Sequence, residues 1–270
     1  ATMERAIDGV QRSLREDDWG LWERREALER AAALLREESA RLARIISAES
    51  SKTITEATRE AARTAETIRL SAASGHLLEG ETLALADTPR GAGRFGWNRR
   101  APLGVIAAIT PFNDPMNLVA HKVGPALIAG NAVVLKPAKT TPLSALALLD
   151  ILLRAGVPKG RMAVLVSERD AGTALVSDPR VAAVSFTGGP VTGDALVRAA
   201  GARKILMELG GNNAVVVCED GDVAAAAAGF ALLLMAGRGA LSDAPVDSVE
   251  PQVGGNTVVI PDGPASWATD

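Results

Sequence analysis

Hydrophobic positions along this chain follow a helical period first and form short continuous runs later. Over residues 3–78, apolar side chains return every three or four positions with Glu and Arg between them. This spacing predicts amphipathic helices that bury one face, the last running from about Thr55 to Leu78. Apolar runs then alternate with helical stretches, at 104–109, 131–135, 162–166, 181–185 and 214–217. We therefore expect an α/β fold with a Rossmann-like, doubly wound parallel sheet.

Two further segments depart from these patterns. Residues 82–100 read as short strands interrupted by Pro89, Gly91 and Gly93, which predicts a projecting β-ribbon of the kind that pairs with another subunit. After Leu241 the chain is rich in proline and glycine, with one strand candidate at Thr257–Ile260. The expected organisation is a helical part over 1–80, an oligomerisation ribbon over 81–100, an α/β domain over 101–240 and an atypical tail over 241–270.

Composition and charge narrow the class of partner. Apolar residues make up 47% of the chain, and the net charge of −3 comes without a run of Lys or Arg, which argues against a nucleic-acid partner. One cysteine, Cys218, excludes an internal disulfide and fits the cytoplasm; we expect it to pack within a strand. The longest uncharged run, Val223–Gly237, is too short for a bilayer span and predicts a helix buried on most sides. His76 and His121 are too isolated to predict a metal site.

Polar residues follow two of the predicted strands. Asn113, in Thr110-Pro-Phe-Asn, could donate an N–H to an oxyanion at a carbonyl carbon, worth ~3–4 kcal/mol if well placed. The alternative is a cap for a helix beginning near Pro115. Lys136, in Lys136-Pro-Ala-Lys139, stands where open α/β sheets bind ligands and could reach a ribose or phosphate. The alternative is an ordinary surface lysine.

Two glycine-bearing motifs follow later in the chain. Phe186-Thr-Gly-Gly189 opens a helix, where small residues let a phosphate approach backbone N–H groups, although such turns are common. Glu208-Leu-Gly-Gly211 places a carboxylate beside two glycines. If partly buried, Glu208 would have a raised pKa and could act as a general base; the alternative is an ion-paired structural residue.

Taken together, these motifs resemble the aldehyde dehydrogenase superfamily over about residues 1–240. The stretches that carry the resemblance occur in that family's order and spacing: Ala101-Pro-Leu-Gly-Val through Pro111-Phe-Asn, His121-Lys-Val-Gly-Pro-Ala-Leu-Ile-Ala-Gly-Asn131, Val134-Leu-Lys-Pro-Ala-Lys-Thr-Thr-Pro-Leu143, Phe186-Thr-Gly-Gly and Glu208-Leu-Gly-Gly-Asn-Asn. The resemblance implies NAD(P)-dependent oxidation of an aldehyde to an acid. The most similar branch acts on small hydroxy-, keto- or phosphono-aldehydes. A small aldehyde substrate and a homo-oligomer are therefore the implied partners, with no nucleic acid or membrane.

The resemblance also implies roles for individual residues. Asn113 would be the oxyanion donor, Glu208 the general base, and Lys122 a lysine in a proton relay. Lys139 stands where the family carries an acid or a small residue, so its charge favours NADP over NAD. The implied cofactor-binding residues are Thr110, Phe112, Lys136, Pro137, Lys139, Phe186, Thr187, Gly188, Gly189, Leu209 and Gly210.

One departure concerns the nucleophile. Where the family carries Asn-Ala-Gly-Gln-x-Cys, this chain has Met235-Ala-Gly-Arg-Gly-Ala240, which places Ala240 at the position of the thiol. Counting from Glu208 instead places Ser242 there. The chain also ends before most of the family's catalytic domain. Three interpretations follow: a truncated aldehyde dehydrogenase, a non-catalytic nucleotide-binding or assembly module, or a hydrolase that uses Ser242.

Overall fold

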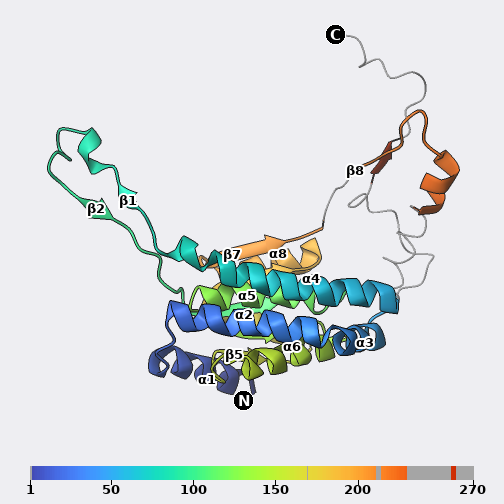
Figure 1. The fold of residues 1–270 in the computed structure, drawn as a ribbon, viewed down its shortest axis with the longest axis horizontal. Helices are drawn as coiled ribbons and strands as arrows, with labels where there is room; N and C mark the ends of the chain where they lie inside the picture. The colour runs from blue at the N-terminus through green and yellow to red at the C-terminus, as the bar shows by residue number, and fades with distance from the viewer. Residues whose placement is uncertain (1, 169, 211–213, 230–256, 260–270) are drawn as a thin grey trace, which may run out of the picture. The chain divides into compact units, whose positions relative to one another are not determined.

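The structure is a computed structural model that describes residues 2–168, 170–210, 214–229 and 257–259. Two compact units divide the chain, residues 1–209 and 210–270. The first unit begins with the predicted helices (Figure 1), which are α1 (Thr2–Glu16), α2 (Leu21–Glu37), α3 (Ser39–Glu49), α4 (Ile54–Ala73) and the 3-10 helix η1 (Ser74–Leu78). A capping box begins α4: Thr53 Oγ1 accepts from Glu56 N at 3.3 Å, and Glu56 Oε2 accepts from Thr53 N at 2.8 Å.

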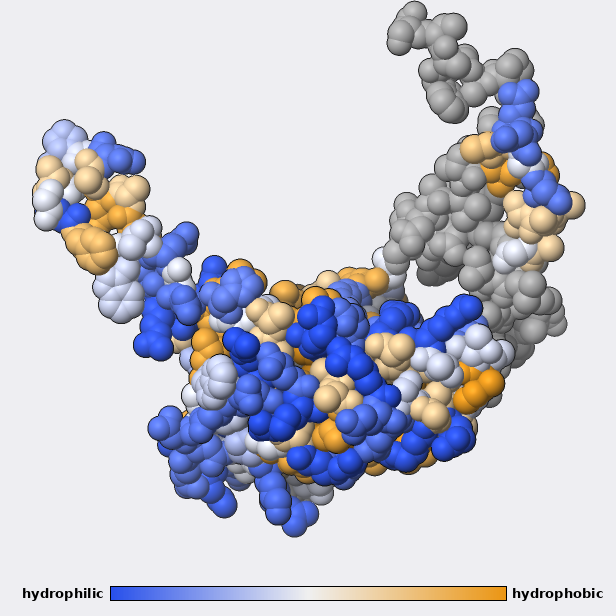
Figure 2. All heavy atoms as spheres, in the orientation of Figure 1, coloured by the Kyte–Doolittle hydropathy of each residue, from blue (hydrophilic) through white to orange (hydrophobic). Residues whose placement is uncertain are grey.

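A two-stranded ribbon follows the helices. Strands β1 (Thr82–Leu83) and β2 (Gly96–Trp97) pair antiparallel, with the short 3-10 helix η2 (Leu85–Asp87) between them. Large apolar side chains stay exposed along this segment, Phe95 and Trp97 among them. Figure 2 shows hydrophobic residues gathered over the ribbon. Its few buried contacts contrast with the body of the unit.

The remainder of the first unit alternates strands and helices. Its elements are β3 (Val105–Ile109), α5 (Asn117–Ile128), β4 (Ala132–Lys136), α6 (Pro142–Arg154), β5 (Met162–Val164), α7 (Asp170–Ser177), β6 (Val181–Thr187), α8 (Pro190–Ala200) and β7 (Lys204–Glu208). The sheet has the order β5-β4-β3-β6-β7, and every neighbouring pair is parallel. The chain thus winds outward in both directions from β3, which confirms the expected doubly wound α/β fold.

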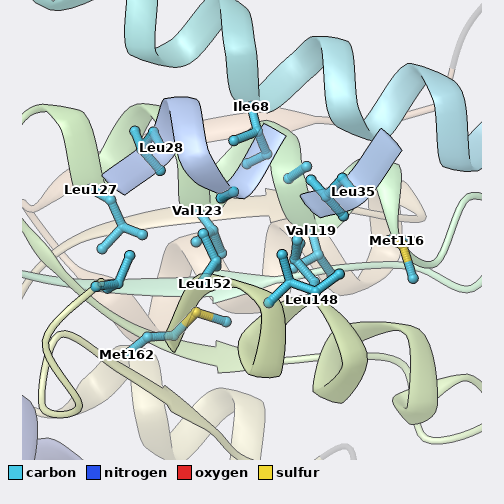
Figure 3. Packing of buried hydrophobic residues seen from close by; sticks show 14 of the residues in the cluster. Leu28, Leu35, Ile68, Met116, Val119, Val123, Leu127, Leu148, Leu152 and Met162 are labelled. Carbon is cyan, nitrogen blue, oxygen red and sulfur yellow. The ribbon is translucent and has the colours of Figure 1, made fainter. Parts of the chain in front are cut away.

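Helices cover both faces of the sheet because successive strand residues point to opposite sides. On one face, Ile106, Val133 and Leu135 join a core with α2 to α6. Figure 3 shows helix residues of this core, among them Leu28 of α2, Ile68 of α4 and Val123 of α5. On the other, Ala107, Val134 and residues of β6 pack with α1, α7 and α8. Two separate hydrophobic cores therefore hold the central strands, whose carboxyl ends all lie at one edge.

The fifth strand of this sheet was not the predicted one. Residues 214–217 were expected there, but β8 (Ala214–Val216) pairs with β9 (Thr257–Val259) in the second unit. The fifth strand is β7, an edge strand whose residues alternate between exposed and half-buried. Its apolar run, Ile205 to Met207, is only three residues long and is bounded by Lys204 and Glu208, so it does not stand out among the longer runs.

Two expectations for the second unit were also wrong. Cys218 follows β8 and is exposed rather than packed within a strand. Residues 223–229 are helical, but all except Ala226 are exposed, so this segment is not a helix buried on most sides. The predicted strand at Thr257 is present as β9. Within the described ranges, no helix combines the length and hydrophobicity needed to cross a membrane.

Candidate functional site

A cleft of about 520 Å³ opens at the carboxyl ends of β3, β4 and β6. Parallel α/β sheets bind ligands at this edge, where the winding reverses direction. Most of the residues implied for cofactor binding line the cleft: Thr110, Phe112, Lys136, Lys139, Phe186, Thr187, Gly188 and Gly189. Segments far apart in the sequence thus meet at one place.

The other implied cofactor residues are not part of this lining. Pro137 is buried next to Lys136. Leu209 packs toward the first turns of α8, since an ideal β-carbon at Gly193 would lie 2.6 Å from Leu209 Cδ2. Gly210 belongs to the second unit.

The turn between β6 and α8 leaves its backbone accessible. Gly189 is the N-cap of α8 and Pro190 its first residue. A β-carbon at Gly189 would meet nothing within 4 Å, whereas one at Gly188 would lie 2.5 Å from Phe186 Cζ. Gly188 N also donates to Glu208 O at 3.1 Å, which fixes the turn to β7. A helix start with an open backbone, inside a ligand-sized cleft, suits a phosphate group.

Two buried hydroxyls in the cleft have no hydrogen-bond partner among the described residues. These are Thr110 Oγ1 after β3 and Ser167 Oγ after β5. Buried polar groups are normally satisfied, so such atoms indicate a place for a polar ligand. Lys136 is only 8% exposed, so the surface-lysine alternative is wrong; its stem lies against Gly172 at the start of α7. The role of Ser167 was missed, because nothing in the sequence indicates which hydroxyls become buried.

A carboxylate lies opposite Lys139 in the cleft. Glu168, on the turn between β5 and α7, forms an ion pair with Lys139, and both side chains line the cleft. The two side chains are 73% and 66% exposed, so the pair itself contributes little to stability. Lys139 therefore does not present an uncompensated charge to a ligand.

Lys122 and Glu208 are each hydrogen-bonded to a hydroxyl of β6, and their opposite charges interact electrostatically. Lys122 is 6% exposed and donates to Ser185 Oγ at 3.1 Å. Thr187 Oγ1 donates to Glu208 Oε2 at 2.9 Å, and these two residues are partners across β6 and β7. Burial lowers the pKa of Lys122, and the negative charge of Glu208 partly opposes this shift. Glu208 itself is exposed, so the partial burial that the general-base interpretation assumed is absent.

Asn113 lies exposed in the bend between β3 and α5. It does not cap the helix, because α5 begins at Asn117 with Met116 as N-cap. The cap comes instead from Glu60 on α4, whose Oε1 accepts from Met116 N at 2.8 Å and from Asn117 N at 3.1 Å. Glu60 is 1% exposed. A carboxylate from another helix thus satisfies the start of α5.

Further charges tie this bend to α4. Lys52 Nζ contacts Glu60 Oε2 at 2.5 Å and also forms an ion pair with Asp114. Arg63 Nη2 lies 3.2 Å from Asp114 Oδ2. We call Lys52, Glu60 and Asp114 the α4–α5 brace. It holds the residues that follow Asn113. No sequence pattern indicates it, because Glu60 occupies an ordinary polar position of an amphipathic helix.

Ala240 and Ser242, the two candidate nucleophile positions, lie outside the described residues. Within the described part of the chain, no group of three or more His, Cys, Asp or Glu could hold a metal ion. On one side of the strand ends, the described residues therefore form a cleft lined by glycines and lysines. On the other side lies a lysine–carboxylate network.

Fold and cleft together define a doubly wound α/β protein with a ligand-sized site at its strand ends. The family model for the aldehyde dehydrogenase family matches residues 1–241. The chain belongs to the aldehyde dehydrogenase family. This agrees with the resemblance found in the motifs.

Individual relatives show the same likeness. Aspartate-semialdehyde dehydrogenase 1 of Pseudomonas canavaninivorans is 44% identical over 199 residues, covering 74% of this chain and 42% of that protein. The 3-sulfolactaldehyde dehydrogenase of Priestia aryabhattai is 42% identical over 207 residues, covering 76% and 43%. The crystal structure of NADP-dependent glyceraldehyde-3-phosphate dehydrogenase from Bacillus halodurans C-125, complexed with NADP, superposes with a TM-score of 0.77. It is 34% identical, and the match covers 84% of this chain and 48% of that one. The chain thus spans less than half the length of these relatives.

Proposed function

We propose that this chain is the cofactor-binding part of an NAD(P)-dependent aldehyde dehydrogenase, which oxidises a small aldehyde to an acid. The observation that carries the proposal is the cleft at the ends of β3, β4 and β6, in a chain of this family. Its orphaned hydroxyls, its open glycine turn and Lys136 fit a dinucleotide. When bound, the nicotinamide of NAD(P)+ supplies the hydride acceptor.

The proposed roles of this chain's residues follow from their places in the cleft. Gly189 presents its backbone N–H to the pyrophosphate, Gly188 is held beside it by its own bond to Glu208 O, and Lys136 binds a ribose hydroxyl. The remaining cofactor contacts are assigned to Thr110, Phe112, Pro137, Lys139, Phe186, Thr187, Leu209 and Gly210. A dinucleotide laid across these strand ends reaches the polar network at Glu208.

On the substrate side we assign three roles. The Asn113 carboxamide donates an N–H to the oxygen of the reacting carbonyl, and the bend that carries it is held by the α4–α5 brace. Glu208 accepts a proton from the attacking water. Lys122, buried and bonded to Ser185, supplies positive charge near Glu208 and holds a proton at Nζ.

The second candidate function is a nucleotide-binding or assembly module without turnover. Ala240 favours it, because an alanine at the motif's nucleophile position supplies no thiol. Both functions need the same cleft, and only the first needs a nucleophile and a complete substrate site.

Partners and setting complete the proposal. A small aldehyde is the substrate, and a cytoplasmic homo-oligomer paired through the ribbon at 81–100 is the assembly. The exposed apolar side chains Phe95 and Trp97 support this role for the ribbon. We keep the division into 1–80, 81–100, 101–240 and 241–270 as the proposed functional organisation.

Incubating the purified chain with NADP or NAD and a panel of small aldehydes tests the proposal. Appearance of reduced cofactor that Glu208→Gln abolishes supports the dehydrogenase. Thermal stabilisation by the dinucleotide without turnover supports the binding module, since a ligand that binds only the folded state raises apparent stability. If the dinucleotide produces neither stabilisation nor turnover, both candidate functions are refuted.

A further inference from the structure

We infer that Glu168 is a specificity-determining residue, which opposes Lys139 and lets the cleft accept NAD as well as NADP. This inference rests on the proposed function and names a residue that selects between the two cofactors. It starts from the ion pair between Lys139 and Glu168, both of which line the cleft. The charge of Lys139 alone would favour a 2′-phosphate, and its partner changes that conclusion.

The strand order places this pair at the ribose end of the cleft. The glycine turn that suits the pyrophosphate follows β6, whereas Lys139 follows β4 and Glu168 follows β5. In the order β5-β4-β3-β6, β4 is two strands from β6 and β5 is three. Neighbouring strands lie about 4.8 Å apart, so β4 and β5 run roughly 10 and 14 Å from β6. A dinucleotide anchored at the turn and extending toward β5 brings its adenosine ribose to this pair.

The two side chains favour opposite substituents at that ribose. An ammonium attracts a 2′-phosphate, which carries close to two negative charges, and a carboxylate repels it. The carboxylate instead accepts a hydrogen bond from a free 2′-hydroxyl, as acidic residues do in dinucleotide sites of this topology. Ser167, beside Glu168, also lines the cleft, and its buried Oγ has no partner among the described residues.

Because both side chains are mainly exposed, either can turn toward a ligand at small cost. With NADP, Lys139 leaves Glu168 for the phosphate. With NAD, Glu168 leaves Lys139 for the hydroxyl. The pair therefore lets the cleft bind both cofactors, and removing one partner should leave a site that prefers one of them.

Calorimetric titration of NADP and NAD into the full chain tests this. Glu168→Gln keeps the shape and an acceptor oxygen but removes the charge, and it should raise the ratio of NADP to NAD affinity by about fivefold or more. Lys139→Gln should lower the ratio by a similar factor. Both effects should shrink as salt is added, because the charges are exposed. Glu29→Gln, which breaks the exposed Arg25–Glu29 pair on α2, is the matched control and should leave the ratio unchanged.

The outcomes separate this inference from the proposed function. If both dinucleotides bind and Glu168→Gln changes the ratio less than about twofold, Glu168 does not select the cofactor and the inference is overturned alone. If neither dinucleotide binds the wild-type chain, the proposed function is overturned, and the inference with it. Opposite shifts of the ratio in the two variants establish it.

Discussion

Replacing Glu60 with alanine should destabilise the first unit more than any exposed charge substitution on the same helix. The side chain is 1% exposed, and its two oxygens serve Met116 N, Asn117 N and Lys52 Nζ. Alanine leaves two backbone donors at the start of α5 without their acceptor and leaves Lys52 with Asp114 alone. Breaking a buried pair by removing one partner costs about 3–5 kcal/mol, and we expect a loss in that range.

Chemical denaturation at pH 7 measures this loss as a change in the midpoint at constant slope. Glu60→Gln should cost less, because the amide oxygen still accepts from Met116 N while the attraction to Lys52 is lost. The matched control is Glu66→Ala on the same helix, whose partners Arg36 and Arg69 are exposed. That control should leave the midpoint nearly unchanged.

A loss below about 1 kcal/mol for Glu60→Ala would refute the reasoning, because it would mean that water satisfies α5 and Lys52 equally well. Equal losses for Glu60→Ala and Glu66→Ala would refute it too. If the slope changes together with the midpoint, the variant has altered the cooperativity of unfolding rather than a single contact.

Three further predictions concern stability. Gly130→Ala should destabilise the folded state by about 2 kcal/mol or more, because φ is +83° and a β-carbon would overlap the guanidinium of Arg24. Gly9→Ala, within α1, should instead stabilise the folded state by about 0.5–1 kcal/mol. Thermal melts of the two variants compare these effects. Arg180→Gln should remove stability that depends on pH: hydrogen bonding to Arg180 lowers the pKa of Asp178, so the contribution is present above the ordinary value of 3.8 and disappears as pH falls below it. The difference in unfolding free energy between Arg180→Gln and wild type should therefore be smaller at pH 2.5 than at pH 6. Lys122→Met should raise stability at pH 7, because burial lowers the pKa of this lysine. The cost of burying the charge applies below the pKa of the folded state and vanishes above the ordinary pKa of 10.5. A gain in stability that does not fade as pH approaches 10.5 would contradict this prediction.

Periodicity was enough to predict the central strands and the helices around them. Continuous apolar runs marked β3, β4 and β6, because buried parallel strands carry apolar residues on both faces. The edge strand β7 could not be found in this way, since Leu206 is exposed and the run between Lys204 and Glu208 is short. Pairing of β8 with β9 depends on residues about forty positions apart, and such pairing leaves no local signal.

The candidate site, too, could be predicted only in part from the sequence. Strand-end position brought Thr110, Lys136 and Gly188 to one cleft, because topology alone decides which loops meet. The roles of Glu60 and Glu168 could not be predicted from the sequence, since no local pattern distinguishes a buried or paired glutamate from a solvated one. Their roles depend on which helix packs beside which, as the contacts of Glu60 with α5 show.

Amide chemical-shift mapping of the chain during titration with NADP tests the central claim most directly. We expect saturable shifts at Thr110, Lys139, Gly188 and Gly189, whose backbones surround the cleft, with little change along α2 and α3. Shifts confined to other surfaces, or no saturable shift at millimolar NADP, would contradict the account.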